Sequence, residues 1–214
     1  MHTSTDANES ILYAYNFRSR AERELWTLQE LRLPYQVIRL DPFNGDVNTA
    51  EFRKLNPSAK IPVLIHDGHV LTESLAIMEY LNDISTEIKL IPTGALENYT
   101  FRNIIHYGLT ELEPYLWIAD QATRLRKLYN WQKGTHIEAI NRVRSSIDRV
   151  WDWIQTDRFI AGDAFSLADI YYYQTLTWAT FYKIELPDKV IDYLERLEAR
   201  DSFPPELRAL TSYT

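Results

Sequence analysis

The chain of 214 residues is long enough for one large domain or two small ones, and its apolar fraction of 45% is typical of a globular fold. A formal charge of −7 argues against nucleic-acid binding, because phosphate contacts need clustered Lys and Arg. No cysteine is present, which excludes a disulfide, a thiolate metal site and a cysteine nucleophile, and we expect no metal. The polar start MHTSTDANES and the lack of a long apolar run predict a cytoplasmic protein without a membrane segment, with a flexible tail over residues 1–10.

The first part of the chain alternates between strand-like and helix-like segments. The expected elements are a strand over 11–15, a helix over 19–32, a strand over 36–40, a short helix over 49–56, two strands within 60–71 and a helix from 72 to about 83. Pro34 ends the first helix, because the residue before a proline disfavours the helical conformation. Asp67-Gly68 is typical of a hairpin turn, and Thr72 is placed to cap the last helix.

The chain beyond residue 84 is expected to be helical. IPTGALEN lies at the end of a linker predicted over 85–97. From Ile137 to Ile154, apolar residues recur at steps of three and four, which indicates an amphipathic helix. Ser166 and Asp169 have the spacing of a capping box at the start of another helix. The sequence therefore predicts an α/β domain over 11–84, followed by an all-α helical-bundle domain over 98–214.

The run KIPVL places a proline at the beginning of an expected strand. A proline inside a strand removes a hydrogen-bond donor, so Pro62 belongs at a strand start or edge. A cis Ile61-Pro62 bond would turn the preceding backbone outward and leave a free N–H and C=O to pair with an extended peptide.

The run TESLAIMEYL places Glu73 and Ser74 in the first turn of a helix. The exposed N–H groups and positive end of the helix attract a carboxylate there, and the Ser74 hydroxyl can bond the same group. Glu73 can take a positively charged amino group, so the pair suits an α-amino acid. The alternative is ordinary capping by Thr72.

The stretch NFRSRAERE places Ser19 between Arg18 and Arg20 at the expected start of the first helix. Ser19 is a typical helix N-cap. Its hydroxyl can also donate a hydrogen bond to a thiolate or an oxyanion, and either arginine adds positive charge that favours the deprotonated thiol. The local sequence leaves both roles open.

Taken together, these stretches resemble the glutathione transferases. The agreement is strongest from Ile11 to Asp83, over the runs SRAERELWTLQELRLPY, NPSAKIPVL and TESLAIMEYL. In the second part, ELEPYL and AGDAFSLADI are similar to the helical domain of that family. The resemblance implies a thioredoxin-like first domain that binds glutathione as a co-substrate.

The resemblance alone implies the glutathione contacts. Pro62 matches the cis proline of the family, and Ile61 matches the residue whose backbone pairs with the cysteinyl part of glutathione. Glu73 and Ser74 match the pair that holds the γ-glutamyl end. Lys60 matches a position that reaches the glycine carboxylate in several classes.

The resemblance also suggests which residue activates the thiol. Ser19 is the first candidate, because the ungapped match places it nearest the serine of the serine-type members. Arg18 and Arg20 are alternatives, because FRSRA also looks like the cyanobacterial chi-type enzymes, for which an arginine has been put forward. Tyr15 comes next, since many classes use a tyrosine near the end of the first strand.

The electrophile is expected to bind between the domains, against the first long helix of the second domain. The candidate residues on that helix and on a later one are His106, Tyr107, Thr110, Glu111, Tyr115, Trp178 and Tyr182. For His106 the alternative is a structural histidine held by hydrogen bonds.

The resemblance therefore predicts a homodimeric enzyme of detoxification. It would join the glutathione thiolate to small hydrophobic electrophiles or reduce organic peroxides. One alternative is a non-catalytic module that keeps the fold for binding or interaction, although Lys60-Ile61-Pro62 and Glu73-Ser74 are complete. Another is a specialised lyase or isomerase that uses glutathione catalytically.

Overall fold

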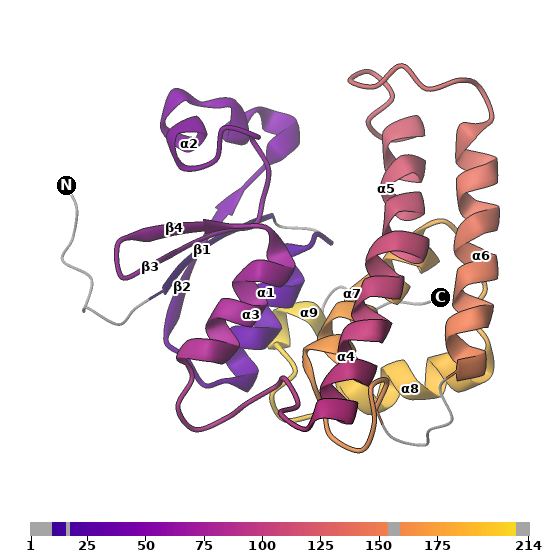
Figure 1. The fold of residues 1–214 in the computed structure, drawn as a ribbon. Helices are drawn as coiled ribbons and strands as arrows, with labels where there is room; N and C mark the ends of the chain where they lie inside the picture. The colour runs from indigo at the N-terminus through magenta and orange to yellow at the C-terminus, as the bar shows by residue number, and fades with distance from the viewer. Residues whose placement is uncertain (1–9, 16–17, 154–158, 209–214) are drawn as a thin grey trace. The chain divides into compact units, whose positions relative to one another are not determined.

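The structure is a computed structural model that describes residues 10–15, 18–153 and 159–208. By its internal contacts the chain divides into two compact units, Met1–Leu90 with Glu198–Thr214, and Ile91–Leu197 (Figure 1). Residues 1–9 of the expected tail lie outside the described residues, and Ser10 already belongs to the first strand. The domain boundaries drawn from the sequence stay a prediction.

A four-stranded mixed sheet forms the centre of the first unit. Its strands are β1 (Ser10–Tyr15), β2 (Tyr35–Leu40), β3 (Val63–His66) and β4 (His69–Thr72), in the order β2-β1-β3-β4. The β1–β2 pair is parallel, whereas β1–β3 and β3–β4 are antiparallel. The expected hairpin is confirmed, and Asp67 and Gly68 both adopt the positive φ angles that its tight turn requires.

Helices cover both sides of this sheet. Figure 1 shows α1 (Ala21–Glu30) and α3 (Ser74–Ile84) together on one side and α2 (Ala50–Leu55) on the other. The loop between β2 and α2 contains two 3₁₀ turns, η1 (Pro42–Asn44) and η2 (Asp46–Asn48). The predicted order β-α-β-α-β-β-α is therefore confirmed.

The C-terminal segment packs onto α1. The Trp26 and Phe203 rings meet edge to face with centroids 4.9 Å apart. Arg200 forms an ion pair with Glu30 at 2.5 Å, and the Ser202 hydroxyl donates to the other oxygen of the same carboxylate. The short helix α9 (Pro205–Arg208) follows these contacts. Helix α1 is therefore packed against residues that lie about 170 positions later in the sequence.

The regular elements of the second unit are helices, and among its described residues the β-type pairing is one isolated bridge between Phe159 and Gly162. The helices are α4 (Ala95–Tyr107), η3 (Gly108–Leu112), α5 (Glu113–Ala122), α6 (Thr135–Trp153), α7 (Leu167–Phe181) and α8 (Asp188–Glu198). The turn η3 has π-helical geometry, and so α4, η3 and α5 follow one another without a loop. The sequence did not predict this wider turn.

Two details of the second unit differ from the expectation. Helix α4 begins at Ala95, inside the segment 85–97 that was expected to be a linker. In α6, Ile137 is 57% exposed whereas Ala139 is buried, so the apolar face begins two residues later than the isoleucine pattern suggests. The predicted capping box at the start of α7 is confirmed, with reciprocal bonds between Ser166 and Asp169.

Candidate functional site

The loop before β3 carries the cis peptide bond that was expected between Ile61 and Pro62. Pro62 is buried, Ile61 is half-buried and Lys60 is exposed. The side chain of Asn56 holds this loop, because its Nδ2 donates to the carbonyl of Lys60 at 2.8 Å and its Oδ1 accepts from the Ser58 N–H at 3.0 Å. Asn56 is a positioning residue that the sequence analysis missed.

Glu73 and Ser74 form the start of α3, but Thr72 does not cap the helix. Thr72 is the last residue of β4, and the N-cap is Glu73, whose side chain makes no capping bond. Glu73 has φ 68° and ψ 108°, a left-handed conformation that costs on the order of 1–3 kcal/mol for a residue with a side chain. Its side chain is exposed at the positive end of α3, where a ligand amino group could reach it.

Ser74 is 8% exposed and connects α3 to α1. Its hydroxyl accepts a hydrogen bond of 3.2 Å from Nη1 of Arg23, which is only 1% exposed. A buried guanidinium therefore lies directly behind the hydroxyl that was expected to bond a carboxylate. This positive charge adds to the attraction of the helix end for an anion.

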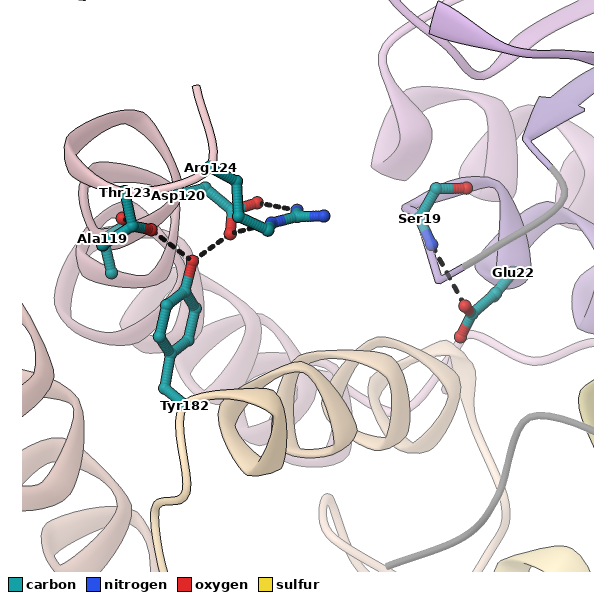
Figure 2. A network of polar contacts seen from close by, with 7 residues as sticks. All are labelled: Ser19, Glu22, Ala119, Asp120, Thr123, Arg124 and Tyr182. Carbon is teal, nitrogen blue, oxygen red and sulfur yellow. Dashed lines mark hydrogen bonds and ion pairs between the residues drawn. The ribbon is translucent and has the colours of Figure 1, made fainter. Parts of the chain in front are cut away.

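Ser19 does not cap α1, which was one of the two roles that the sequence left open. The helix begins at Ala21, and its N-cap is Arg20. The backbone N–H of Ser19 donates to the carboxylate of Glu22 at 3.0 Å, as Figure 2 shows, and the Glu22 N–H returns to the carbonyl of Ser19 at 3.1 Å. Oγ of Ser19 is buried and makes no hydrogen bond with any described residue. The hydroxyl therefore does not cap the helix, and its O–H group can donate a hydrogen bond to a ligand.

Glu22 is the carboxylate that organises this turn. Its side chain is buried, and burial raises its pKa from 4.5 to about 7. The charge of Arg18, the N–H of Ser19 and the charges of Arg23 and Arg39 oppose this rise. Glu22 is consequently divided between its protonated and ionised forms near neutral pH, next to the candidate thiol-activating residue.

The alternatives to Ser19 lie in the same region. Arg18 and Arg20 are both half-buried, and the charge of Arg18 acts on Glu22. Tyr15 ends β1, where its carbonyl accepts a hydrogen bond of 2.8 Å from Arg39 and its ring lies 6.0 Å from the ring of Phe43.

The electrophile candidates of the first long helix lie on three consecutive elements. His106 and Tyr107 end α4, Thr110 and Glu111 lie on η3, and Tyr115 lies on α5. His106 and Thr110 are exposed, and the other three are half-buried.

Contacts with α6 and α7 hold this stretch in place. Ser146 donates its hydroxyl to the carbonyl of Glu111 at 2.5 Å and accepts at its own carbonyl from the Tyr107 hydroxyl at 3.5 Å. A Cβ at Gly108 would lie 2.5 Å from Cε1 of Tyr171, so only glycine permits this approach.

The two later candidates differ in accessibility. Trp178 is 8% exposed within α7, whereas Tyr182 is half-buried at the end of that helix. The Tyr182 hydroxyl donates to the carboxylate of Asp120, which also binds Arg124, as Figure 2 shows. Burial, and then the hydrogen bond to Asp120, raise the pKa of Tyr182, so that its phenol stays protonated.

A separate hollow of about 370 Å³ lies in the second unit, and none of the predicted site residues lines it. Its lining residues are Arg144, Ile147, Asp148, Lys183, Ile184 and Glu185. Among the described residues, no group of three His, Asp or Glu side chains is arranged to hold a metal ion. Within the same part of the chain, no helix has both the length and the apolar character needed to cross a bilayer.

Two of these contacts join residues whose spacing in the sequence is typical of such a contact. Ser19 and Glu22 have the spacing of a capping box, which consists of two reciprocal hydrogen bonds. The bond from the Ser19 N–H to the Glu22 carboxylate forms, whereas the bond to the Ser19 hydroxyl does not. Asp120 and Arg124 have the spacing of a helical ion pair. The bond between Arg23 and Ser74 had no such signal, because 51 residues separate the two.

Two domain models of one family match the chain. The model described as Glutathione S-transferase, N-terminal domain, matches residues 10–83, and the one described as Glutathione S-transferase, C-terminal domain, matches residues 137–209. The chain belongs to the glutathione S-transferase family. The thioredoxin-like α/β domain and the helical domain expected from the sequence are thereby confirmed.

Individual relatives agree with this membership. Maleylacetoacetate isomerase of Dictyostelium discoideum is 27% identical over 172 residues, which cover 76% of each chain. A glutathione S-transferase domain-containing protein of Marinobacter aquaeolei superposes with a TM-score of 0.80 at 25% identity, over 91% of this chain and all of that one. A glutathione transferase homologue from Sulfitobacter, solved with bound glutathione, has the same fold, with a TM-score of 0.74 at 21% identity over 91% of this chain and 95% of that one.

Proposed function

We propose that the protein is a glutathione transferase that joins the thiolate of glutathione to small hydrophobic electrophiles. The observation that carries this proposal is the Ser19 hydroxyl, which is buried at the start of α1 without a hydrogen-bond partner among the described residues. A buried hydroxyl normally has a partner, and a thiolate sulfur is an acceptor that this one can serve. Arg18 and Arg20 are the alternative activating groups, followed by Tyr15.

The remainder of the first unit supplies the contacts for glutathione. Ser74, whose hydroxyl accepts a hydrogen bond from Arg23, binds the γ-glutamyl carboxylate, and Glu73 binds the amino group. Ile61 pairs through its backbone with the cysteinyl part, and Lys60 reaches the glycine carboxylate. The glutathione bound to the Sulfitobacter homologue supports this assignment at the level of the fold.

The energy required for thiol activation is within reach of these groups. Lowering a thiol pKa by about 2 units corresponds to about 2.7 kcal/mol of preferential thiolate stabilisation. One charge-assisted hydrogen bond contributes about 1.5–3 kcal/mol, and a helix end adds a fraction of that. The Ser19 hydroxyl and the positive end of α1 together are therefore sufficient to lower the thiol pKa by this amount.

The chemical step balances without any further reactant. The thiol proton leaves to solvent, and the sulfur then forms a bond to the electrophilic carbon while a leaving group departs or a double bond takes up a proton. With an organic peroxide, two glutathione molecules give the disulfide, an alcohol and water. The second unit would hold the electrophile through His106, Tyr107, Thr110, Glu111, Tyr115, Trp178 and Tyr182.

Conjugation assays with Ser19→Ala and Arg18→Ala test this function. Turnover of a chlorodinitrobenzene or isothiocyanate substrate should fall with Ser19→Ala and stay unchanged with Ser145→Ala, an exposed serine on α6. No turnover across a broad electrophile panel would exclude the enzyme. Loss in Arg18→Ala alone would transfer the role from Ser19 to the arginine. Lack of retention on a glutathione column would instead favour a non-catalytic binding module.

An isomerase or lyase that uses glutathione catalytically is the second candidate. The similarity to a maleylacetoacetate isomerase over three quarters of each chain favours it. Such an enzyme would isomerise an activated double bond and release glutathione unchanged. Measuring free thiol during turnover distinguishes the two, because a transferase consumes glutathione and an isomerase does not.

We also propose that the protein is a cytoplasmic homodimer that works in detoxification. The family membership supports this assembly. Sedimentation at micromolar concentration should give a mass of about two chains, and a monomer would contradict the proposal.

A further inference from the structure

The turn that follows α5 carries an arginine whose guanidinium is held by a buried carboxylate near the end of the helix. Asp120 is 2% exposed and accepts from Nε of Arg124 at 3.0 Å and from Nη2 at 2.5 Å. The side chain of Arg124 is 37% exposed, so the guanidinium extends from its buried partner toward solvent. This side-on pairing orients the guanidinium plane.

A second helix holds the carboxylate from the other side. The Tyr182 hydroxyl at the end of α7 donates to Oδ1 of Asp120, the oxygen that also accepts from Nε of Arg124 (Figure 2). The Thr123 hydroxyl lies 3.5 Å from Tyr182 and donates to the carbonyl of Ala119 at 2.6 Å. The orientation of Arg124 therefore depends on residues from two helices.

The outer edge of the guanidinium remains available. A guanidinium has five N–H donors, and Asp120 takes one from Nε and one from Nη2. Nη1 of Arg124 makes no hydrogen bond with the described part of the chain. The Nη1 and Nη2 donors of that edge form a fork, and this fork matches the two oxygens of a carboxylate.

An apolar face lies beside this fork. The ring of Phe181 is 5.0 Å from Cζ of Arg124 and is 56% exposed. A ligand that binds both would carry an anionic carboxylate next to a flat apolar group. The charge of Asp120 already balances that of Arg124, so recognition would come from the geometry of the donors rather than from excess positive charge.

We infer that Arg124 binds a carboxylate of the electrophile, that Asp120 and Tyr182 are its positioning residues, and that the preferred substrates are aryl acids. This inference rests on the proposed transferase function. The competing explanation is that the ion pair only closes α5, since the carbonyl of Asp120 also accepts from the N–H of Thr123 at 3.3 Å and of Leu125 at 2.9 Å. A purely structural pair would not distinguish acids from neutral analogues.

The test compares 4-acryloylphenoxyacetic acid with its primary amide as thiol acceptors. In both, the sulfur adds to the vinyl carbon, the double bond opens, and the resulting enolate takes a proton from solvent. Wild-type kcat/KM should favour the acid, and Arg124→Gln should lower kcat/KM for the acid by about 10- to 100-fold, mostly through KM. The amide should be unaffected in Arg124→Gln, which also reports that the variant is folded.

Two controls separate the possible failures. Arg126→Gln removes an exposed arginine two residues away and should change neither substrate. An equal loss of kcat/KM for acid and amide in Arg124→Gln, or no loss for either substrate, would overturn the inference while the transferase function stands.

Ligand-observed NMR with 3-phenylpropanoate and 3-phenylpropanamide measures recognition without turnover. Preference for the acid that disappears in Arg124→Gln supports the site even if no electrophile reacts, whereas equal binding of both overturns it.

Discussion

The carboxylate of Glu22 accepts a hydrogen bond of 3.0 Å from the backbone N–H of Ser19, and the Glu22 N–H donates to the carbonyl of Ser19 at 3.1 Å. These bonds close the turn without the Ser19 hydroxyl, which has no hydrogen-bond partner among the described residues. Because Glu22 has a pKa of about 7, the turn that presents Ser19 changes its charge near neutral pH.

Glu22→Gln should remove a pH dependence of stability. The pKa of Glu22 is about 7 in the folded state against 4.5 as the reference, so the folded protein holds this proton more tightly. The stabilising contribution is complete below pH 4.5 and is lost as the pH rises to about 7, with a total of about 3 kcal/mol.

Denaturant unfolding between pH 4.5 and 8 measures this effect. Wild type should lose stability relative to Glu22→Gln as the pH rises, while Glu138→Gln, at an exposed position on α6, should follow wild type. Parallel curves for wild type and Glu22→Gln would show that Glu22 titrates in its ordinary range.

Ser74→Ala should weaken both the first unit and its binding of glutathione. The substitution takes from Arg23 a buried hydrogen-bond acceptor at 3.2 Å, which costs about 1–3 kcal/mol of unfolding free energy. It also removes the hydroxyl proposed to bond the γ-glutamyl carboxylate, so the KM for glutathione should rise about 10-fold. Thermal unfolding and initial rates give the two readouts. A lower Tm with an unchanged KM would assign Ser74 a structural role only.

Local patterns in the sequence were sufficient for the elements but not for their contacts. The capping box of Ser166 and Asp169 and the turn at Asp67-Gly68 were predicted because each involves only neighbouring residues. Glu73 was expected in the first turn of α3, because threonine is a favoured N-cap residue and Thr72 precedes it. The structure instead makes Glu73 the N-cap, with a positive φ that the sequence did not predict.

Contacts between distant residues had no such signal. Tyr182 was proposed as an electrophile contact, yet its bond to Asp120, 62 residues earlier, could not be read from spacing. The burial of Arg23 was equally hidden, because a charged residue in a polar stretch is usually solvated. The sequence therefore proposed the candidate residues, and only the structure showed which residues they contact.

Gly108→Ala should destabilise the second unit. The new methyl group would lie 2.5 Å from Cε1 and 3.0 Å from the hydroxyl oxygen of Tyr171, whose side chain is fully buried. Overpacking of this kind costs about 1–3 kcal/mol. Thr110→Ala on the same π-helical turn is the matched control, because Thr110 is exposed and should change stability by less than about 0.5 kcal/mol. Equal unfolding midpoints for both variants would show that η3 moves freely away from α7.

Asp169→Ala should be among the most damaging single substitutions in α7. The buried carboxylate accepts from the N–H of Ile160, from the N–H and hydroxyl of Ser166 and from the hydroxyl of Tyr193. Removing it leaves buried donors without an acceptor and the helix without its capping box, at a cost of about 3–5 kcal/mol.

The matched variant Asp169→Asn separates shape from hydrogen bonding. An amide keeps the volume but replaces one acceptor oxygen with a donor, so it should recover only part of the loss. Chemical unfolding of Asp169→Ala, Asp169→Asn and Tyr193→Phe gives the order, with Tyr193→Phe the mildest because only one bond to the carboxylate is removed. Full recovery of the unfolding free energy by asparagine would mean that Asp169 acts by filling space. The four donors that bond the carboxylate would then contribute the same free energy with a neutral amide as with a charged group.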